Sequence, residues 1–466
     1  MGSFIILSTV LVLLFIVQPF ARYLWDPQNL RRFPSHNALS GITNLGYIIE
    51  RCRGFRSRYI HEAHKKHNIV RTGPNSLSFS SPEAIRSIYG HSTNCIKGDI
   101  RLIRQFDRIC DEAASATNTK TGTLDFRKRA NLFTVEAIAD IALSHKLGCL
   151  DRGDDQVTIT TADGNEKRIK YIECLHAGKR ATSTLVWATS WFRFLRTVLT
   201  LLPGWFRSQW LKGSQFDDMV HHLTRVRVER HRTGETLDDI VYCLIADKNG
   251  ELRGFDIGEI EAEVGVLLDA GSDTTAIALT HVMYNLLRHP KALQRLRDEL
   301  KETLDVDSPV ASYGQVKNLP YLRACLDESM RLLPPVSFGL NRKTSLGGLT
   351  IDGQWIDEGT TVGVPAYTAH RNPELFPDPE RYYPERWLEE MNKDAMTSFI
   401  PFSAGARGCI GRNITYMEQM ILIASLVRRY DFALLHDDWE LDHEEAFNLW
   451  PGPMPLSISK RQDLDD

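Results

Sequence analysis

The chain has almost no net charge and no regular cysteine spacing. Its 56 Lys plus Arg residues nearly balance 59 Asp plus Glu residues, which leaves a net charge of -3 over 466 residues. This balance excludes an overall electrostatic attraction to nucleic acid. No two of the eight cysteines have the Cys-x-x-Cys spacing of a zinc ribbon or a redox pair, and their dispersal indicates reduced thiols in a reducing compartment. Internal repeats and low-complexity tracts are also missing from the sequence, which excludes a solenoid and a largely disordered chain.

The composition is that of an ordinary globular protein. Hydrophobic residues make up 42% of the chain and charged residues 25%, which is enough apolar material for a large core. Most of the sequence has helical periodicity and strand patterns are few, so we expect a mainly α fold with a small β-sheet region. Seven of the cysteines are expected to be small buried hydrophobic residues. Cys409 is treated separately because of its neighbours.

An uncharged apolar segment lies near the start of the chain, from Phe4 to Val17. A helix extended from it to Trp25 would measure about 33 Å at about 1.5 Å per residue, which is enough to cross a hydrocarbon core of about 30 Å. We therefore predict a transmembrane anchor over residues 1–25 and one large folded domain over residues 26–466.

The charges around this segment predict its orientation. Arg22, Arg31 and Arg32 follow it, whereas no Lys or Arg precedes it. The positive-inside rule then places the amino terminus in the lumen and the body of the protein in the cytosol. The alternative is a cleaved signal peptide, for which a basic region before the apolar segment and a small-residue cleavage site would be expected.

Two strand patterns and one long helix are predicted from local signals. Residues 68–79 read as two short strands around a Gly73-Pro74 turn, and residues 151–168 read as an exposed loop or hairpin. The longest helical pattern runs from about residue 256 to residue 289 and is closed by Pro290.

The middle of this long helix contains polar residues in an apolar context, between Asp269 and Thr275. Gly271 costs up to about 1 kcal/mol relative to alanine in a helix, and a buried Asp273 or Thr274 needs hydrogen-bond partners. One explanation is a satisfied core network with a glycine that permits close packing. The other is a functional requirement at this point of the helix.

A glycine-rich loop surrounds Cys409 in residues 401–412. Three glycines allow the backbone to bend tightly and to direct N–H groups toward the sulfur. Arg407 adds positive charge, and a thiolate is the form of cysteine that binds metal. The alternative reading is a nucleophilic cysteine with a histidine base close to it in space.

The loop resembles the haem-binding loop of the cytochrome P-450 monooxygenases. The pattern Phe-x-x-Gly-x-Arg-x-Cys-x-Gly is matched by Phe402, Gly405, Arg407, Cys409 and Gly411. Five fixed positions should occur by chance in on the order of one in ten thousand chains of this length. The resemblance extends from about residue 31 to the end of the chain and implies the fold of that family.

Three further segments resemble motifs of the same family in the same order. They are the oxygen-binding groove at 270–275, the Glu-x-x-Arg motif at 328–331 and the Pro-Glu-Arg element at 384–387. The resemblance implies a buried ionic triad of Glu328, Arg331 and Arg386, in which bidentate guanidinium–carboxylate geometry makes burial tolerable.

The resemblance also implies the cofactor, haem b, and the residues around it. Cys409 would be the axial ligand of the haem iron, and its thiolate would favour O–O cleavage. Phe402 would shield the sulfur and Arg407 would pair with a haem propionate. Gly411 and Arg342 are further cofactor-binding candidates, although Arg342 also fits an ordinary surface arginine.

On the other side of the haem, the resemblance implies a proton path and an electron donor. Gly271 would leave room for dioxygen, while Thr274 and Asp273 would hold the water that delivers protons. NADPH would supply electrons through a cytochrome P-450 reductase on the cytosolic side of the endoplasmic reticulum membrane. Arg412, Arg428 and Arg429 are candidate docking residues for that reductase.

One region departs from the family pattern. Residues 89–99 run directly into the helical pattern at 100–112, and no tryptophan occurs between Trp25 and Trp187. We therefore predict an internal deletion near residues 95–105, which removes part of the region between the first helices and the central helices.

The predicted activity is a haem-thiolate monooxygenase that inserts one oxygen atom from O2 into a small lipophilic substrate. The comparison is nearest to fungal enzymes, including relatives of benzoate 4-monooxygenase, so fungal secondary metabolism or oxidation of aromatic compounds is expected. Two alternatives are an inactive remnant that binds haem poorly and an isomerase or dehydratase that works without a reductase.

Overall fold

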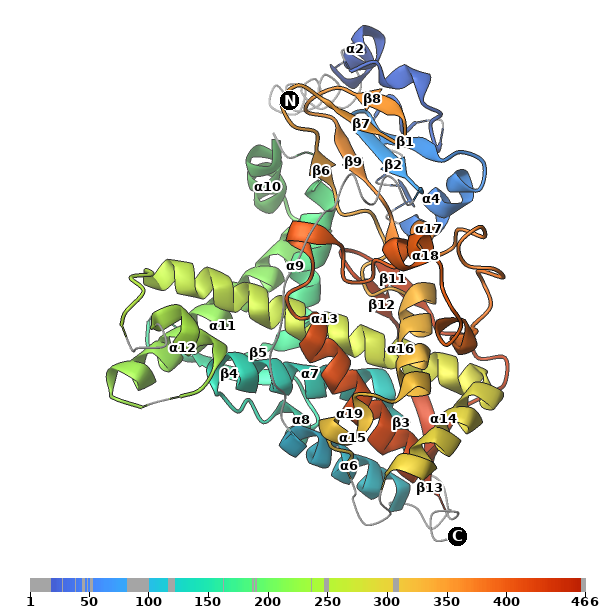
Figure 1. The fold of residues 1–466 in the computed structure, drawn as a ribbon. Coiled ribbons are helices and arrows are strands. Elements are labelled where there is room, and N and C mark those ends of the chain that lie inside the picture. Colours follow the sequence, from blue (N-terminus) through green and yellow to red (C-terminus); the bar gives the residue numbers. More distant parts are fainter. Residues whose placement is uncertain are drawn as a thin grey trace. The chain divides into compact units, whose positions relative to one another are not determined.

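The segments predicted as strands and as the long helix form these elements in the computed structural model (Figure 1). The structure describes residues 18–26, 28–37, 39–43, 47, 49–50, 53–81, 100–115, 122–161, 163–186, 188, 191–235, 237–246, 251–304 and 310–461. The chain divides into two compact units. The first unit comprises residues 1–94, 328–410 and 443–449, and the second comprises residues 95–327, 411–442 and 450–466.

The first unit contains a four-stranded sheet in the order β1-β2-β9-β6. The predicted hairpin is confirmed: β1 (Ile69–Gly73) and β2 (Ser76–Phe79) pair antiparallel across the Gly73-Pro74 turn. β9 (Thr361–Gly363) pairs parallel with β2, and β6 (Arg342–Lys343) pairs antiparallel with β9. The sheet joins the start of the chain to a segment far along it.

The core of this unit is apolar, and its side chains come from residues 30–79 and from residues 351–400. Buried side chains that pack together are Leu30, Phe33, Leu77, Phe79, Ile351, Ile356, Val362, Val364, Ala366, Ala369 and Ile400. The remaining elements are α2 (Gln18–Trp25), η2 (Leu30–Arg32), α4 (Arg56–His64), β7 (Leu349–Ile351), β8 (Gln354–Ile356), α17 (Ala366–Ala369), η4 (Pro384–Trp387), α18 (Lys393–Ser398), η5 (Gly405–Arg407) and β11 (His443–Glu445).

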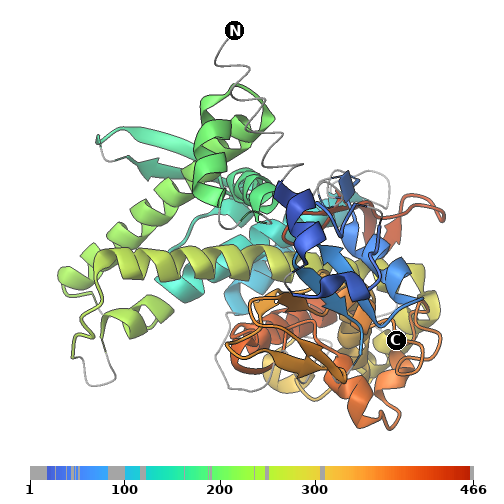
Figure 2. The same ribbon diagram turned by 90° about the horizontal axis from the view of Figure 1, so that it is seen from above.

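The second unit is mainly helical and is built around α13 (Ile257–Arg288). Asp256 and Glu259 form a capping box at its start, and Pro290 opens the next helix, α14 (Pro290–Thr303), so both predicted ends are confirmed. α13 packs against α7 (Phe126–Leu143), α11 (Trp205–Arg232) and α19 (Arg412–Arg429). Figure 2 shows α13 along its length.

Shorter helices and small sheets complete the second unit. The other helices are α6 (Ile100–Ser115), α8 (Cys149–Arg152), α9 (Tyr171–Leu185), α10 (Phe192–Leu201), α12 (Ile240–Ile245) and α15 (Tyr313–Val316). Antiparallel β10 (Tyr430–Leu434), β13 (Pro455–Lys460) and β3 (Gly122–Asp125) form one sheet in that order. The predicted exposed segment is a hairpin of β4 (Gln156–Thr160) and β5 (Glu166–Lys170). Two elements contain residues of both units: α16 (Pro320–Leu332) and β12 (Leu449–Pro451).

The predicted anchor and the predicted deletion lie largely outside the described residues. Within the described part of the chain, no helix is both long enough and apolar enough to cross a bilayer. The uncharged segment 4–17 is not described, and α2 covers the last part of the predicted anchor. Residues 95–99 are also outside the description, whereas residues 100–105 lie in the first turns of α6.

The cysteines follow the expected pattern with one correction. Cys110, Cys149, Cys174 and Cys325 are buried, as predicted for small apolar residues. Cys243 was expected to be buried but is exposed, because it lies on the outer side of the short helix α12.

Candidate active site

The Cys409 loop is held in shape by backbone hydrogen bonds. The amide of Cys409 donates to the carbonyl oxygen of Phe402 at 2.9 Å, and the amide of Gly408 donates to that of Gly405 at 2.7 Å. Ser403 and Gly405 have left-handed φ angles of 58° and 70°, conformations that glycine adopts more readily than serine. The sequence therefore forms a tight, closed loop with Cys409 on its rim.

The residues of this loop fit a flat apolar cofactor that is held through sulfur. Cys409 is exposed, and Ile410 beside it is 90% exposed, although free cysteine and isoleucine are among the residue types most often buried. A Cβ at Gly408 would lie only 3.1 Å from the carbonyl oxygen of Gly405, so a side chain there would be crowded. An exposed thiol on a fixed loop matches the requirement for a single sulfur ligand, and the loop therefore fits a haem with Cys409 on its iron.

The structure brings Glu328, Arg331 and Arg386 together in the first unit. Glu328 and Arg331 have fully buried side chains, and Arg331 Nε and Nη2 donate to Glu328 Oε2 and Oε1 at 2.8 and 2.9 Å. Arg386 Nε donates to Glu328 Oε1 at 3.1 Å. Burial raises the pKa of Glu328, but the hydrogen bonds and charges of Arg331 and Arg386 outweigh it and leave that pKa below its ordinary value.

This ionic cluster has members that the motif did not predict. The indole Nε1 of Trp387 donates to Glu328 Oε2 at 2.9 Å, and the amide of Tyr383 donates to Oε1 at 2.9 Å. Arg331 also donates to the backbone carbonyls of His370, Pro379 and Arg381. Trp387 is the last residue of the Pro-Glu-Arg element and Tyr383 directly precedes it, so their closeness to Arg386 in the sequence is the signal that could have revealed them.

Asp273 lies in a second buried ionic cluster, in the second unit. Its carboxylate is fully buried and accepts hydrogen bonds from Arg127 Nη2 at 3.1 Å, His176 Nε2 at 3.1 Å and Lys179 Nζ at 3.4 Å. The indole Nε1 of Trp450 donates to the same carboxylate at 2.6 Å. Burial raises the pKa of Asp273, but the positive charges around it hold that pKa well below its ordinary range.

This second cluster could not be predicted from the sequence around Asp273. Its donors come from α7, α9 and the segment near the carboxyl end, and no local spacing connects these positions. Asp269, one turn before Asp273, pairs with Lys179 at 2.6 Å. The structure therefore provides the satisfied core network that was one of the two explanations for the polar residues in this helix.

Gly271 and Thr274 occupy different environments on the same helix. A Cβ at Gly271 would lie 2.6 Å from Cδ1 and Cγ1 of Ile138 on α7, so close packing of two helices explains the glycine. Thr274 is half-buried, and its hydroxyl donates to the carbonyl oxygen of Ala270 at 2.8 Å. Its oxygen can still accept a hydrogen bond from another molecule.

The remaining cofactor-binding candidates lie in or near the first unit's loops. Arg407 is exposed on η5, beside Cys409 in the sequence, and Phe402 is half-buried at the start of the loop. Arg342 is half-buried on β6, where its Nη1 donates to the carbonyl oxygen of Asn341 at 3.1 Å. Gly411 is the N-cap of α19.

Two of the three arginines suggested for reductase docking are committed elsewhere, which corrects that prediction. Arg428 is buried and donates to the carbonyl oxygen of Leu300 at 3.1 Å. Arg429 pairs with Asp107 and Asp111 of α6. Arg412 is exposed at the start of α19. Residue 428 lies on the apolar face of α19, which turns toward the core. A position on the helix that follows the cysteine loop therefore did not predict that the arginine side chain is exposed.

Histidines of the first unit are also placed inside it. His61 and His64 on α4 are buried, and burial together with nearby cationic groups lowers the pKa of each to about 4. Over the described residues, no group of three His, Cys, Asp or Glu side chains could hold a metal ion.

Comparison with known proteins identifies one family over most of the chain. The family model described as Cytochrome P-450 matches residues 54–457. Cytochrome P-450 monooxygenase tpeC of Talaromyces stipitatus is 28% identical, over 92% of this chain and 89% of that protein. Cytochrome P-450 monooxygenase poxC of Penicillium oxalicum is 30% identical, over 90% of this chain and 87% of that protein.

Benzoate 4-monooxygenase bphA of Aspergillus niger is similar over nearly the whole length of both proteins. It is 28% identical, over 98% of this chain and 97% of that protein. The alignment extends over 520 positions, more than the 466 residues of this chain. Some positions of that relative therefore have no counterpart in this chain.

Proposed function

Because the chain belongs to the cytochrome P-450 family and is an oxidoreductase of the monooxygenase type, we propose that it inserts one oxygen atom from O2 into a C–H bond of a small lipophilic substrate. The observation that carries this proposal is the closed loop with its exposed Cys409. A haem bound through a cysteine thiolate supplies the activation of dioxygen, and NADPH supplies the electrons through a partner reductase.

The loop residues hold and shield the cofactor in this proposal. Cys409 binds the iron, Phe402 covers the sulfur, and the exposed Arg407 pairs with a propionate. Gly411 keeps the backbone free of a side chain at the start of α19, and Arg342 is a second propionate partner. The buried cluster around Glu328 supports the segments that precede the loop, because its donors come from several separate stretches of residues 331–387.

On α13 we assign the proton-handling role to Thr274 and a positioning role to Asp273. The Thr274 hydroxyl is partly accessible and can hold a water molecule. Asp273 is fully buried and surrounded by donors from other elements, so it holds α13 against α7 and α9. Gly271 allows α13 to approach α7 closely, which gives it a packing function besides any space it leaves for dioxygen.

The reduced carbon monoxide difference spectrum of the purified chain tests this function. We expect a red-shifted Soret band that disappears in Cys409→Ser and turnover that requires NADPH and a reductase. Wild-type protein without a haem band would indicate an inactive remnant. Turnover that persists without NADPH would indicate an isomerase or dehydratase.

The substrate in this proposal is a small lipophilic compound of fungal secondary metabolism or an aromatic compound. Its support is the set of fungal relatives, one of which is named an averantin hydroxylase and another a benzoate 4-monooxygenase. A deletion near residues 95–105 would shorten the substrate side of the protein. Type I spectral shifts with benzoate and with averantin would show which of these two kinds of compound binds.

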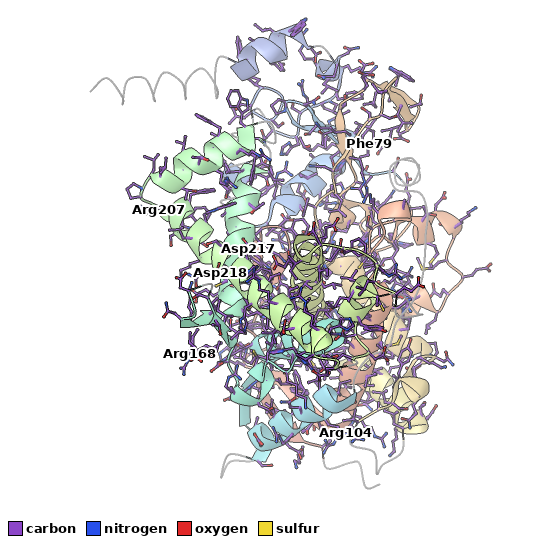
Figure 3. All side chains as sticks on the ribbon, turned by 90° about the vertical axis from the view of Figure 1, so that its left-hand side faces the viewer. Phe79, Arg104, Arg168, Arg207, Asp217 and Asp218 are labelled. Carbon is purple, nitrogen blue, oxygen red and sulfur yellow. The ribbon has the colours of Figure 1, made fainter. Side chains whose placement is uncertain are left out.

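Attachment to the cytosolic face of the endoplasmic reticulum membrane is also part of the proposal, through residues 1–25 and a second surface. No Asp or Glu occurs between Glu173 and Asp217, whereas four of the nine Trp do, together with five Lys or Arg besides the buried Lys179. The described part of this stretch exposes apolar side chains at the end of α9, along α10 and in the first turns of α11: Val186, Trp191, Phe194, Leu201, Leu202, Trp205 and Leu211. Figure 3 marks Arg207 near the start of α11 and the acidic pair Asp217 and Asp218 further along that helix.

A basic, tryptophan-rich, apolar surface without carboxylates matches an anionic lipid interface. A chain that begins at Gln18 should still sediment with anionic vesicles, and Trp191→Ser with Leu201→Ser should reduce that binding. Leu252→Ser is the matched control, since Leu252 is an exposed apolar residue elsewhere in the same unit. Equal binding by all three chains would contradict the second surface.

A further inference from the structure

A buried histidine connects the Glu328 cluster to the cysteine loop. His370 follows α17 and is fully buried. Its Nδ1 lies 3.1 Å from the carbonyl oxygen of Arg331, and its Nε2 lies 2.8 Å from the amide nitrogen of Ile400. Its own carbonyl oxygen accepts a hydrogen bond from Arg331 Nη1 at 2.9 Å.

The two neighbours of the ring leave one possible protonation state. The Ile400 amide can only donate, so Nε2 must accept; the Arg331 carbonyl can only accept, so Nδ1 must carry the proton. Burial, and then the positive charge of Arg331, lower the pKa of His370 to about 3. The ring is therefore neutral at physiological pH and acts as a fixed spacer between two backbone segments.

Ile400 is the point at which this spacer reaches the loop. Its carbonyl oxygen accepts a hydrogen bond from the Ser403 amide at 3.0 Å. The carbonyl oxygen of Phe402 accepts a hydrogen bond from the Cys409 amide at 2.9 Å. Residue 401 is proline, which restricts the backbone of Ile400. A short series of backbone hydrogen bonds thus leads from the imidazole to the amide of the cysteine.

A ring contact runs alongside this series of hydrogen bonds. The Phe399 ring lies 5.3 Å from the His370 ring and 4.5 Å from the Trp387 ring, between ring centroids. Trp387 in turn donates to Glu328. The segment before the loop is therefore fixed to the Glu328 cluster both by a hydrogen bond and by aromatic packing.

We propose that His370 is a positioning residue that sets the entry of the Cys409 loop by accepting the Ile400 amide. The inference rests on the proposed function insofar as Cys409 is the ligand of the haem iron. His370 lies outside the cysteine loop, the Glu-x-x-Arg motif and the Pro-Glu-Arg element. Its task is to hold the sulfur in the geometry of a thiolate ligand.

Three substitutions in the full chain separate the two hydrogen bonds. His370→Gln places an oxygen near the position of Nε2 and retains an acceptor for Ile400. His370→Asn places an N–H near the position of Nδ1 and retains only the donor to Arg331. His370→Phe retains an aromatic ring and removes both hydrogen bonds. His64→Phe is the matched control, because His64 is also buried but bonds to Ser78 and His67.

Two measurements are made on each protein. Hydrogen exchange of the Ile400 amide needs no cofactor, and we expect about a tenfold loss of protection in His370→Phe and His370→Asn but retention in His370→Gln. The reduced carbon monoxide spectrum should lose part of its red-shifted band in the first two variants and keep it in the third. His64→Phe should lower thermal stability and leave the band in place.

Equal spectra for the Gln and Asn variants, or unchanged Ile400 exchange in His370→Asn, would overturn the proposal. A band lost equally in His64→Phe would also overturn it, since general destabilisation would then be sufficient. If His370→Phe does not fold, the Gln and Asn pair still decides the question. Wild-type protein without any haem band would refute the proposed function, whereas the hydrogen-exchange comparison would still test the contact between His370 and Ile400.

Discussion

The two units each contain a fully buried carboxylate held by cations and one indole, but the two clusters are built differently. Glu328 is held by two arginines and Trp387, and Arg331 also binds three backbone carbonyls. Asp273 is held by an arginine, a lysine, a histidine and Trp450. The planar arginine fork fixes geometry, whereas lysine is a flexible point charge and histidine can change its charge.

The connection to solvent is the second difference between the clusters. Arg331 and Glu328 have no exposed side-chain surface, whereas Lys179 also pairs with Asp269, whose side chain is 41% exposed. The Glu328 cluster is therefore a closed structural element. The Asp273 cluster reaches the surface and can adjust, because one of its cations already has a second partner.

Substitution of Glu328 should have the largest effect. Glu328→Gln leaves Arg331 buried without a compensating charge, and removal of one partner from a buried ion pair costs about 3–5 kcal/mol. We expect a large loss of folded protein in expression and a strongly lowered urea midpoint. A variant with the wild-type midpoint would show that the backbone carbonyls alone satisfy Arg331.

Substitution of Asp273 should cost less, about 3 kcal/mol, at the low end of the range for a buried pair. In Asp273→Asn, Lys179 keeps Asp269 as a partner and His176 can be neutral, so mainly Arg127 is left without a charge. Urea unfolding of both variants under one set of conditions measures the difference. A greater loss for Asp273→Asn than for Glu328→Gln would reverse the comparison.

Gly271→Ala should destabilise the second unit by about 1–3 kcal/mol, as expected for overpacking. The added methyl group would meet Ile138 at 2.6 Å. Ile138→Val with Gly271→Ala should recover part of the loss, and a double-mutant cycle would measure the coupling. If the two changes are additive, close packing against α7 does not explain the glycine.

The pH dependence of stability should also distinguish the two units. The pKa of His64 in the folded first unit is about 4, against 6.5 ordinarily, so the unfolded chain takes up a proton that the folded chain does not. Stability then falls as pH decreases from about 6.5 to about 4, by up to about 1.4 kcal/mol per pH unit for each such group. His64→Gln should flatten this slope in urea unfolding measured between those pH values.

Asp273 should act in a different pH window. Its folded-state pKa lies well below 3.8, so its contribution to stability is complete above about pH 4 and is lost as pH falls through the folded-state pKa. In Asp273→Asn, the slope of stability against pH should be unchanged between pH 6.5 and pH 4 and reduced below pH 4. A changed slope between pH 6.5 and pH 4 would indicate that Asp273 is coupled to groups that titrate in that range.

The same contrast explains what the sequence could predict. The family resemblance of two short motifs implied that Glu328 and Arg331, three residues apart on one helix, pair with Arg386, and the structure shows these ion pairs. The predicted long helix and the hairpin at 69–79 also depend on local signals such as a capping residue, a proline or a turn. The partners of Asp273 lie at positions 127, 176, 179 and 450, and only the tertiary fold brings them together.

Burial was the other property that local sequence did not supply. Arg428 reads as a surface residue because it is charged, yet it is buried, and Cys243 reads as a core residue yet is exposed. In each case the outcome depends on which side of a helix faces its neighbours. A polar residue can be buried where a carbonyl accepts its hydrogen bond, as Leu300 does for Arg428.

The parallel pairing of β2 with β9 has a consequence for synthesis of the chain. The side chain of Asn75, next to β2, bonds to the carbonyl oxygen of Gly359, 284 residues later. At about 5–20 residues per second, the ribosome needs about 15–60 s to produce that partner. The nascent amino-terminal stretch therefore waits with an unpaired strand edge and uncovered apolar side chains, and it is a natural client for chaperones until the last third of the polypeptide emerges.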